Sequence, residues 1–449
     1  MLQFVPWRAW AWETLRAGQL PLWNPLVGMG APLVANYQSG LFYPPNWLYF
    51  GLAALGGTPA LAWGQGWLAA AHLAWAGIGM ALLVRRLGLG RFSQTIGGLA
   101  FGLSGYLVGR VGFLSINAAA AWTPWILLTL TPGPLLVGEK RGGEEGGETR
   151  ISFLLLAVCA GMLLLAGHAQ TAWYTLVLAA AWSAGLVWIG SAHSQGWQAR
   201  LLGIARAWLR LGAGVSAGAL LAAVQLLPTA EYWLQSQRAS AVDIDLAMTY
   251  SFWPWRLLTF FAPGLFGSPV SGDYRAYGNY WEDAVYLGLL PVILAVAAVF
   301  SAAIAALRQR KGASPTWQIG TRRRLAGFLA GLILAALILA LGKNTPVFPW
   351  LYHHAPTFAL FQAPTRFMLW AVFGLALLAA LGAQAWQRPQ GRALYWTRLG
   401  TAGAVAVALG AGLAWWAIGR MPSEVNPASI RALAAVGGFG LAAGALALT

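Results

Sequence analysis

Two adjacent carboxylates, Glu282 and Asp283, stand in the segment NYWEDAVYLG, directly before a long apolar run. Neighbouring side chains point in different directions, so we do not expect them to act as a paired acid and base. One of them can cap the start of the following helix, where negative charge is favoured. The other can bind a metal ion, accept hydrogen bonds from sugar hydroxyls or pair with an arginine. Both are candidate catalytic residues, and capping or arginine pairing is the equally weighted structural alternative.

Two further acidic residues are candidates for the same chemistry. Glu231 stands in QLLPTAEYW at the end of a long apolar run. Its structural alternative is a carboxylate that reaches the membrane interface or pairs with Arg238. Glu13 lies in FVPWRAWAWETLRAG, and there we favour a plain surface pair with Arg16, three residues later.

Two arginines have the chemistry of a phosphate site. Arg256 in PWRLL and Arg366 in FQAPTRFMLW each adjoin an apolar run. A guanidinium binds phosphate oxygens with two prongs, although either residue could instead anchor ordinary lipid headgroups. A tight turn in LLLAGHAQTAWYT carries His168 and Gln170. The histidine can move a proton, bind a ligand or cap the turn.

Several kinds of chemistry are excluded by what the sequence lacks. It has no nucleophilic hydrolase motif, phosphate-cradling P-loop or dinucleotide fingerprint, which argues against reactions driven by cytoplasmic ATP. Cys159 is the single cysteine, and we expect it to pack as a small apolar side chain. His353 and His354 are too few for a zinc site. A divalent metal ion is the one candidate cofactor, with no ligands assigned.

The elements that must position these residues are membrane helices. The chain has 449 residues, of which 59% are hydrophobic and 9% charged, whereas soluble domains carry about 25% charged residues. Spanning helices need about 20 apolar residues. The sequence predicts an all-α polytopic membrane protein with about eleven such helices. They lie near 58–84, 95–110, 117–137, 151–167, 171–191, 211–229, 285–307, 325–342, 366–386, 397–418 and 431–449.

The distribution of charge orients these helices. Most of the 28 lysines and arginines fall in alternate connections, which places those connections in the cytoplasm. Residues 1–57, 230–284, 343–365 and 419–430 then face outward. The net charge of +16 therefore reflects membrane orientation. Without a basic helix face or an aromatic single-strand platform, we do not expect nucleic acid as a partner.

The predicted organisation is an external region, 1–57, followed by a multi-span domain, 58–449, with long external loops at 230–284 and 343–365. The stretch PLWNPLVGMGAPLVANYQSGLFYPPNWLYF is rich in Trp, Tyr, Pro and Gly and carries no charge, as expected for a folded wall at the membrane surface. FVPWRAWAWETLRAG is predicted to form a short interfacial helix before it. No signal peptide precedes this external region and the chain stops within an apolar run, so we expect further sequence at both ends.

Seven blocks of sequence carry a resemblance to a known family. Among them LPLWNPLVGMGAPLVANYQSGLFYPPNWLYF, AGHAQTAWYT, YGNYWEDAVYLGLLP and FQAPTRF occur in this order, and nearly the whole chain resembles the YfhO-like bacterial membrane proteins. The resemblance implies a GT-C glycosyltransferase bundle whose external loops carry short interfacial helices. The positions that match the family and serve as candidate substrate-binding residues are Trp23, Asn24, Asn36, Gln38, Tyr43, His168 and Gln170.

The activity that this resemblance implies takes place on the external face of the bacterial plasma membrane. A sugar moves from a polyprenyl-phosphate donor to an envelope polymer, such as lipoteichoic acid, or to a glycolipid. Arg366 and Arg256 would hold the donor phosphate, a carboxylate would take the acceptor's proton, and Trp23 and Tyr43 would pack on the sugar or the lipid. GT-C enzymes commonly carry the catalytic carboxylate in the first external loop, so we expect the main base upstream of Met1.

Two alternatives to this activity remain open. A lipid-linked sugar flippase or transporter would need ionisable residues at mid-bilayer depth, and the apolar runs hold few. A non-catalytic membrane partner of such an enzyme would keep the bundle and lack the base.

Overall fold

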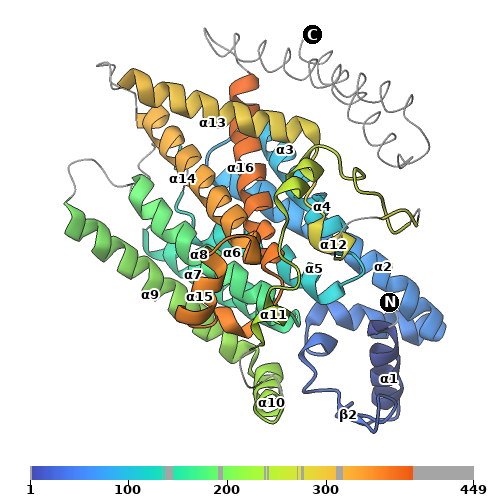
Figure 1. The fold of residues 1–449 in the computed structure, drawn as a ribbon. Helices are drawn as coiled ribbons and strands as arrows, with labels where there is room; N and C mark the ends of the chain where they lie inside the picture. Colours follow the sequence, from blue (N-terminus) through green and yellow to red (C-terminus); the bar gives the residue numbers. More distant parts are fainter. Residues whose placement is uncertain are drawn as a thin grey trace, which may run out of the picture. The chain divides into compact units, whose positions relative to one another are not determined.

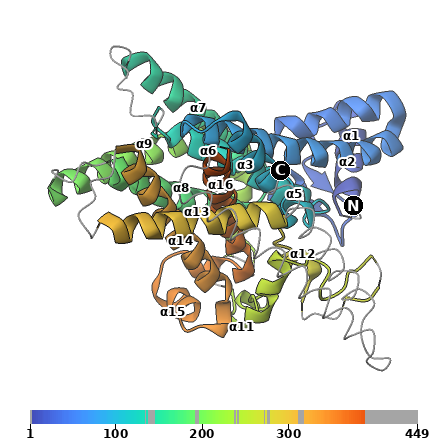
Figure 2. The same ribbon diagram turned by 90° about the horizontal axis from the view of Figure 1, so that it is seen from above.

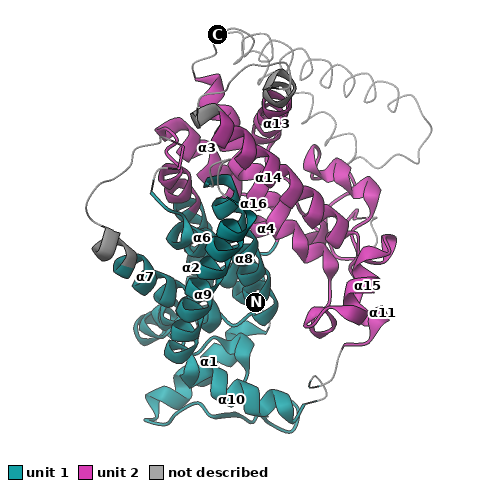
Figure 3. Ribbon diagram, turned by 90° about the vertical axis from the view of Figure 1, so that its left-hand side faces the viewer, with its two compact units in different colours: residues 1–79, 110–133, 139–241 teal, residues 80–109, 134–138, 242–449 magenta. Residues whose placement is uncertain are grey.

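The structure is a computed structural model that describes residues 3–133, 135–136, 145–190, 196–236, 239, 242–270, 272–274, 278–309 and 317–387. The chain divides into two compact units, each assembled from separate stretches of sequence (Figure 3). Unit 1 comprises 1–79, 110–133 and 139–241, and unit 2 comprises 80–109, 134–138 and 242–449. These units follow packing, whereas the division expected at residue 57 follows membrane topology.

Unit 1 contains most of the N-terminal half of the chain. Its elements are α1 (Phe4–Arg16), β1 (Trp23–Asn24), β2 (Ala31–Pro32), η1 (Tyr37–Ser39), η2 (Pro44–Asn46), the first part of α2 (Trp47–Arg86), α5 (Leu114–Ala121), α6 (Thr123–Leu130), α7 (Glu145–Leu165), α8 (Ala169–Gly190), α9 (Trp197–Leu221) and α10 (Ala223–Leu234).

Unit 2 contains the end of α2 and two groups of later elements. They are α3 (Arg91–Gly102), α4 (Gly105–Val108), α11 (Ile244–Ala247), η4 (Pro254–Phe260), α12 (Tyr280–Asp283), α13 (Leu289–Gln309), α14 (Trp317–Ala340), η5 (Gly342–Asn344), α15 (Val347–His354), η6 (Phe358–Leu360), η7 (Pro364–Phe367) and α16 (Met368–Trp386).

Helix α16 forms the core of unit 2. Most of its side chains are buried, and α3, α13 and α14 pack against it (Figures 1 and 2). Small side chains at this contact let the helices approach closely, as at Ala380 on α16 and Gly97 on α3. The Gln384 side chain on α16 accepts a hydrogen bond of 2.7 Å from the backbone N–H of Gly90, at the start of α3. This core carries η7 at its N-terminal end.

Unit 1 is built around α8, which packs against α5, α6 and α9, while α7 packs along α9. Buried polar side chains join α8 to its neighbours. The hydroxyls of Thr123 and Thr175 lie 2.8 Å apart, and the Trp182 indole donates to the Thr131 hydroxyl over 3.0 Å. The helix expected in FVPWRAWAWETLRAG is present as α1, and its Trp10 indole donates to the backbone oxygen of Trp23 at the start of the β1–β2 hairpin.

Among the described residues, four helical segments are long and apolar enough to cross a membrane: Pro44–Arg86, Ala169–Gly190, Gly320–Ala340 and Pro364–Trp386. A fifth is possible if α9 and α10 count as one broken span. The prediction of about eleven spans is therefore not confirmed. Shorter apolar helices occupy Leu114–Leu130, Arg150–Leu165 and Leu289–Ala303. The spans expected near 397–418 and 431–449 lie outside the described residues.

One predicted span is bent in the structure. The segment expected at 211–229 divides between α9 and α10, whose axes differ by 86°. Helix α10 is held by side-chain hydrogen bonds to backbone oxygens of the uncharged segment 21–50, called the wall segment below. Gln225 donates to Val34 over 2.8 Å and Thr229 donates to Ala35 over 3.1 Å. With these polar contacts, the chain bends between α9 and α10 and does not form the single straight span that its apolar pattern alone predicts.

Candidate functional site

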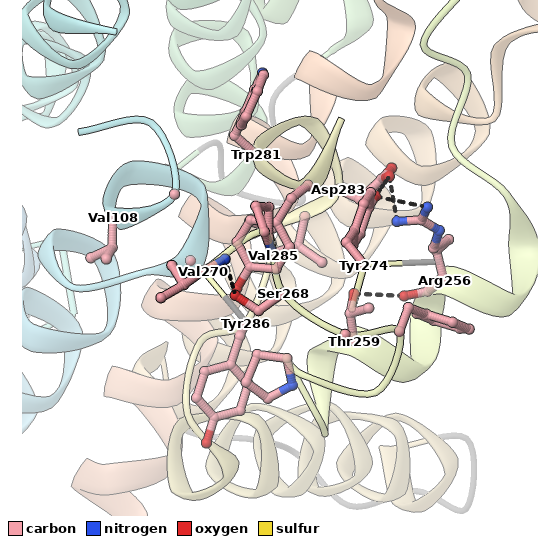
Figure 4. A pocket seen from close by; sticks show the side chains of 18 of the residues that line it. Val108, Arg256, Thr259, Ser268, Val270, Tyr274, Trp281, Asp283, Val285 and Tyr286 are labelled. Atoms are coloured by element: carbon pink, nitrogen blue, oxygen red, sulfur yellow. Dashed lines mark hydrogen bonds and ion pairs between the residues drawn. The ribbon is translucent and has the colours of Figure 1, made fainter. Parts of the chain in front are cut away.

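A cavity of about 460 Å³ lies within unit 2, and it contains one of the two adjacent carboxylates. Its wall is formed by α4, η4, the loop that follows η4, α12 and the extended segment after α12. Figure 4 shows Asp283, Tyr274 and Arg256 side by side on one side of the cavity, with Val108 of α4 on the other. Aromatic rings make up much of the rest of the wall, from Phe266, Tyr280, Trp281 and Tyr286.

Asp283 and Arg256 form a buried ion pair at this wall. The Asp283 Oδ2 atom contacts Nη1 of Arg256, and the two residues are only 7% and 2% exposed. The guanidinium also lies over the rings of Phe266 and Tyr274, with its centre 5.3 Å and 5.7 Å from the ring centroids. The aromatic faces and the carboxylate offset part of the cost of burying this cation.

The Tyr274 hydroxyl completes a triangle with this ion pair. It accepts a hydrogen bond from Nη2 of Arg256 over 3.1 Å and donates to Oδ2 of Asp283 over 3.4 Å. Burial raises the pKa of Tyr274, the Arg256 charge opposes this and the Asp283 charge adds to it. The phenol is therefore neutral at physiological pH, and its hydroxyl can donate the hydrogen bond to Asp283.

Glu282 turns away from Asp283 and pairs with Arg366. Nη2 of Arg366 donates to Oε1 of Glu282 over 2.7 Å, and Nε lies 3.1 Å and 3.2 Å from the two carboxylate oxygens. The Thr365 hydroxyl donates to the backbone oxygen of Glu282 over 2.6 Å, and the Tyr106 hydroxyl donates to that of Arg366 over 3.4 Å. Of the alternatives left open by the sequence, both carboxylates thus show arginine pairing.

The backbone before Arg366 explains how its side chain reaches Glu282. Ala363 has a φ of 66°, in the left-handed region that residues with a Cβ atom seldom adopt. Its N–H donates to the Ala247 oxygen over 3.0 Å, and the N–H of Thr365 donates to the Tyr250 oxygen over 3.2 Å. These bonds fix η7 and therefore the start of α16. The local strain is of the kind found at functional sites.

A close backbone approach brings α4 to the same cavity. A Cβ atom at Gly105 would lie 2.8 Å from the backbone nitrogen of Tyr286, closer than real contacts allow. Only glycine therefore lets the first turn of α4 touch the segment after α12. This contact holds the wall that carries Tyr286 against the wall formed by α4.

Four of the candidate substrate-binding residues come together in unit 1. The turn at Asn36–Gly40 lies against the turn before α8, where a Cβ atom at Gly167 (φ 84°) would meet the Tyr37 oxygen at 2.5 Å. His168 accepts hydrogen bonds at Nδ1 from the backbone and hydroxyl of Thr171, over 3.1 Å and 2.8 Å. Gln170 donates to the Tyr174 hydroxyl over 2.9 Å. The histidine geometry matches the capping alternative.

The other candidate substrate-binding residues come from the uncharged segment 21–50, and most of them form turns or pack in the interior of unit 1. Asn24 accepts from the N–H of Leu26 over 2.9 Å, and Asn36 accepts from that of Gln38 over 3.2 Å. Tyr43 is 1% exposed, and its hydroxyl bonds to His72 and Trp122 over 2.8 Å and 2.9 Å. The expectation that its ring packs on a sugar is therefore corrected: the ring is inside the unit. Trp23 is half exposed and remains accessible.

Two acidic candidates lie on the surface. Glu13 faces Arg16 at 4.0 Å with both side chains largely exposed, which is the surface pair favoured from the sequence. Glu231 is exposed on α10, and its expected partner Arg238 lies outside the described residues. Neither carboxylate has the enclosure that Asp283 and Glu282 have, because the exposed fractions of the latter two are 7% and 2%.

A metal ion does not fit the carboxylates of unit 2. Within the described ranges no group of three or more His, Cys, Asp or Glu side chains converges. Each carboxylate of α12 faces a guanidinium, which places positive charge where a cation would bind.

The sequence reasoning missed Tyr274. It lies in GDYRAYGNYWED, and its position among several tyrosines shortly before the two carboxylates was the available signal. Phe266, which covers the other face of Arg256, gave no signal of its own.

Comparisons of the chain with family models, curated proteins and solved structures gave no match.

Proposed function

We propose that this protein is a membrane glycosyltransferase that moves a sugar from a polyprenyl-phosphate donor to a cell-envelope acceptor on the external face. The single observation that carries the proposal is the buried Asp283–Arg256 pair at the wall of a cavity lined by aromatic rings. A carboxylate and an arginine at one site supply the two groups that this reaction needs, and aromatic faces suit sugar rings. The resemblance to YfhO-like proteins supports the same activity.

Arg256 is the phosphate-binding residue in this proposal. Its guanidinium is already held by Phe266 and Tyr274, so it needs little rearrangement to contact a phosphate oxygen. When a phosphate takes part of its charge, Asp283 loses stabilisation as an anion and becomes a stronger proton acceptor. Donor binding thereby switches the carboxylate from a structural partner to a base.

The reaction then proceeds as a direct displacement. The acceptor hydroxyl attacks the anomeric carbon and gives its proton to Asp283, while the bond from that carbon to the phosphate oxygen breaks. The departing lipid phosphate carries negative charge that Arg256 balances.

Glu282 and Arg366 act as positioning residues in this scheme. Their contact ties α12 to η7, so it fixes the direction in which Asp283 points. This assignment replaces the phosphate contact that the sequence suggested for Arg366. Arg366 is not among the residues that line the cavity, whereas Arg256 is.

The test is transfer in proteoliposomes. The full chain is supplied with radiolabelled polyprenyl-phosphate hexoses and an extract of envelope polymers and glycolipids, and incorporation is counted. Asp283→Asn should lower the rate by about 10²-fold or more, the range for loss of a general base. Asp245→Asn, at an exposed carboxylate of the same unit, serves as the matched control. Equal rates for the two variants would contradict the proposal.

A transporter of lipid-linked sugar is the second candidate, favoured by a specific observation. The candidate span Pro44–Arg86 buries two polar side chains, Gln65 and His72, and α9 and α10 form a broken helix pair. Both features are typical of transporters. Movement of a fluorescent polyprenyl-phosphate sugar between the leaflets of proteoliposomes, with no acceptor present, would identify this function. Transfer that requires Asp283 would exclude it.

A further inference from the structure

Arg8 is a buried cation in unit 1 and is not one of the residues that line the cavity of unit 2. It lies on the inner face of α1 and is 3% exposed. Its guanidinium lies over the ring of Tyr49, with its centre 4.3 Å from the centroid, and over the ring of Phe4 at 5.6 Å. Within the described part of the chain no carboxylate pairs with it, and its Nε and Nη1 atoms have no hydrogen-bond partner.

An amide side chain, Gln65, lies on the face of α2 that packs against α1. Val5 and Trp12, one turn to either side of Arg8, pack against the cluster formed by Tyr49, Leu61 and Leu68. Gln65 lies on α2 between Leu61 and Leu68 and shares their face, because residues three and four apart are neighbours on a helix. Gln65 is 0% exposed, and neither its oxygen nor its nitrogen has a partner in the described structure.

A second amide side chain reaches the same region from α5. Phe4, Ala69 and Leu114 form one cluster, and they lie one turn from Arg8, Gln65 and Asn117 respectively. Asn117 is 1% exposed, and both polar atoms of its side chain lack partners among the described residues. Three helices therefore bring three buried and unpartnered polar side chains toward one place.

A site of this composition has a defined chemistry. Burial lowers the pKa of Arg8, and interaction with Tyr49 opposes that effect. Desolvation thus works against the charged form, yet a guanidinium keeps its proton in proteins. A buried cation without a counter-ion is strongly unfavourable, so an anion bound there gains from both charge and hydrogen bonds.

We propose that Arg8, Gln65 and Asn117 form a binding site for a phosphate group, either free or carried by a lipid. The guanidinium supplies charge and two unpartnered nitrogens, and the two amide groups supply further donors. These donors outnumber the two oxygens of a carboxylate and suit a phosphate, which presents up to four. The site is independent of the proposed transferase function and lies on residues that neither the mechanism nor the family resemblance uses.

Thermal unfolding of the full chain in an uncharged detergent tests this site. The protein is stripped of lipid, and its Tm is followed while inorganic phosphate replaces chloride at constant ionic strength. A ligand that binds only the folded protein raises Tm with its concentration. The same titration with phosphatidylglycerol in the micelles distinguishes the two sources: a response to both indicates free phosphate, and a response to the lipid alone indicates a lipid phosphate.

Variants test whether the rise in Tm comes from phosphate bound at Arg8, Gln65 and Asn117. Arg8→Gln should abolish the rise in Tm, whereas Arg16→Gln, an exposed arginine on the same helix, should keep it. Gln65→Leu retains Arg8 and the packing volume, so it covers the case in which Arg8→Gln does not fold. It should weaken phosphate binding by about tenfold, the usual effect of losing a hydrogen bond to a charged group. A wild-type Tm that responds to neither probe, or an equal response of Arg8→Gln, would overturn the proposal and leave the cluster as a hydrated packing defect.

Discussion

Arg366 and Glu282 are 84 residues apart in the sequence, and the Arg366 guanidinium donates hydrogen bonds to the Glu282 carboxylate through Nε and Nη2. The neighbouring carboxylate, Asp283, faces Arg256 instead. Two consecutive residues of one short helix are thus held by arginines from two different segments. This arrangement orients α12 about its axis and keeps Asp283 directed at the cavity.

Removal of Arg366 should destabilise the protein. Arg366→Ala would leave the Glu282 carboxylate buried without a partner, and breaking a buried pair costs about 3 kcal/mol or more. Replacing both residues by methionine should recover most of the loss, because the uncompensated charge is then gone. The measurement is the free energy of unfolding in detergent micelles.

The exposed pair of Glu13 and Arg16 provides the control for this experiment. Arg16→Ala should change the free energy of unfolding by no more than about 1 kcal/mol. If Arg366→Ala is no more harmful than Arg16→Ala, the contact with Glu282 does not hold α12 in place.

The Tyr274 hydroxyl should make stability depend on alkaline pH. Burial raises the pKa of the folded phenol above the unfolded value of about 10, so its contribution to stability is complete below that pH. As pH rises through the folded pKa, this contribution is lost, because the unfolded phenol ionises first. Tyr274→Phe should therefore show a smaller fall in the free energy of unfolding between neutral and alkaline pH.

Ultraviolet difference absorbance gives a second reading of the same group. The spectrum of wild type minus that of Tyr274→Phe should show one phenol that ionises later than a free tyrosine. A difference signal that titrates at the same pH as a free tyrosine would place Tyr274 in water, outside the triangle with Asp283.

Gly105 should be intolerant of a side chain. Gly105→Ala places a Cβ atom 2.8 Å from the Tyr286 nitrogen, so one wall of the cavity must shift. Overpacking of this kind costs about 1–3 kcal/mol, and we expect a lower transfer rate as well. Gly112→Ala is the matched control, since a Cβ atom there meets no atom within 4 Å. Indistinguishable stability and transfer for the two variants would show that α4 does not shape the site.

The charged residues of the site could be selected from the sequence, whereas their pairing could not. Glu282, Asp283, Arg256 and Arg366 stand out because charge is rare in this chain and each adjoins an apolar run. Which arginine meets which carboxylate depends on the backbone at Ala363, whose left-handed conformation has no sequence signature. Long-range contacts that depend on the backbone conformation of a single residue cannot be predicted from the pattern of residue types.

Other expectations failed because apolar patterning does not reveal polar contacts between segments. The sequence predicts that the Tyr43 ring packs on a sugar or the lipid, but its hydroxyl hydrogen-bonds to His72 and Trp122 and the ring is buried with them. The span expected at 211–229 is bent because α10 bonds to the wall segment through Gln225 and Thr229. The helical class and the helix α1 were predictable, because they depend on local composition and periodicity.

The ion pair between Arg366 and Glu282 also sets an order of events during synthesis of the chain. Arg256 leaves the ribosome before Asp283, so that pair has both members as soon as α12 exists. Glu282 must wait for 84 more residues, which is roughly ten seconds at common rates of translation. Until η7 and α16 are made, this carboxylate has no guanidinium partner and must stay hydrated. The contact that joins α12 to η7 can consequently form only after residue 366 has been made, so it belongs to the last part of the synthesis of the described chain.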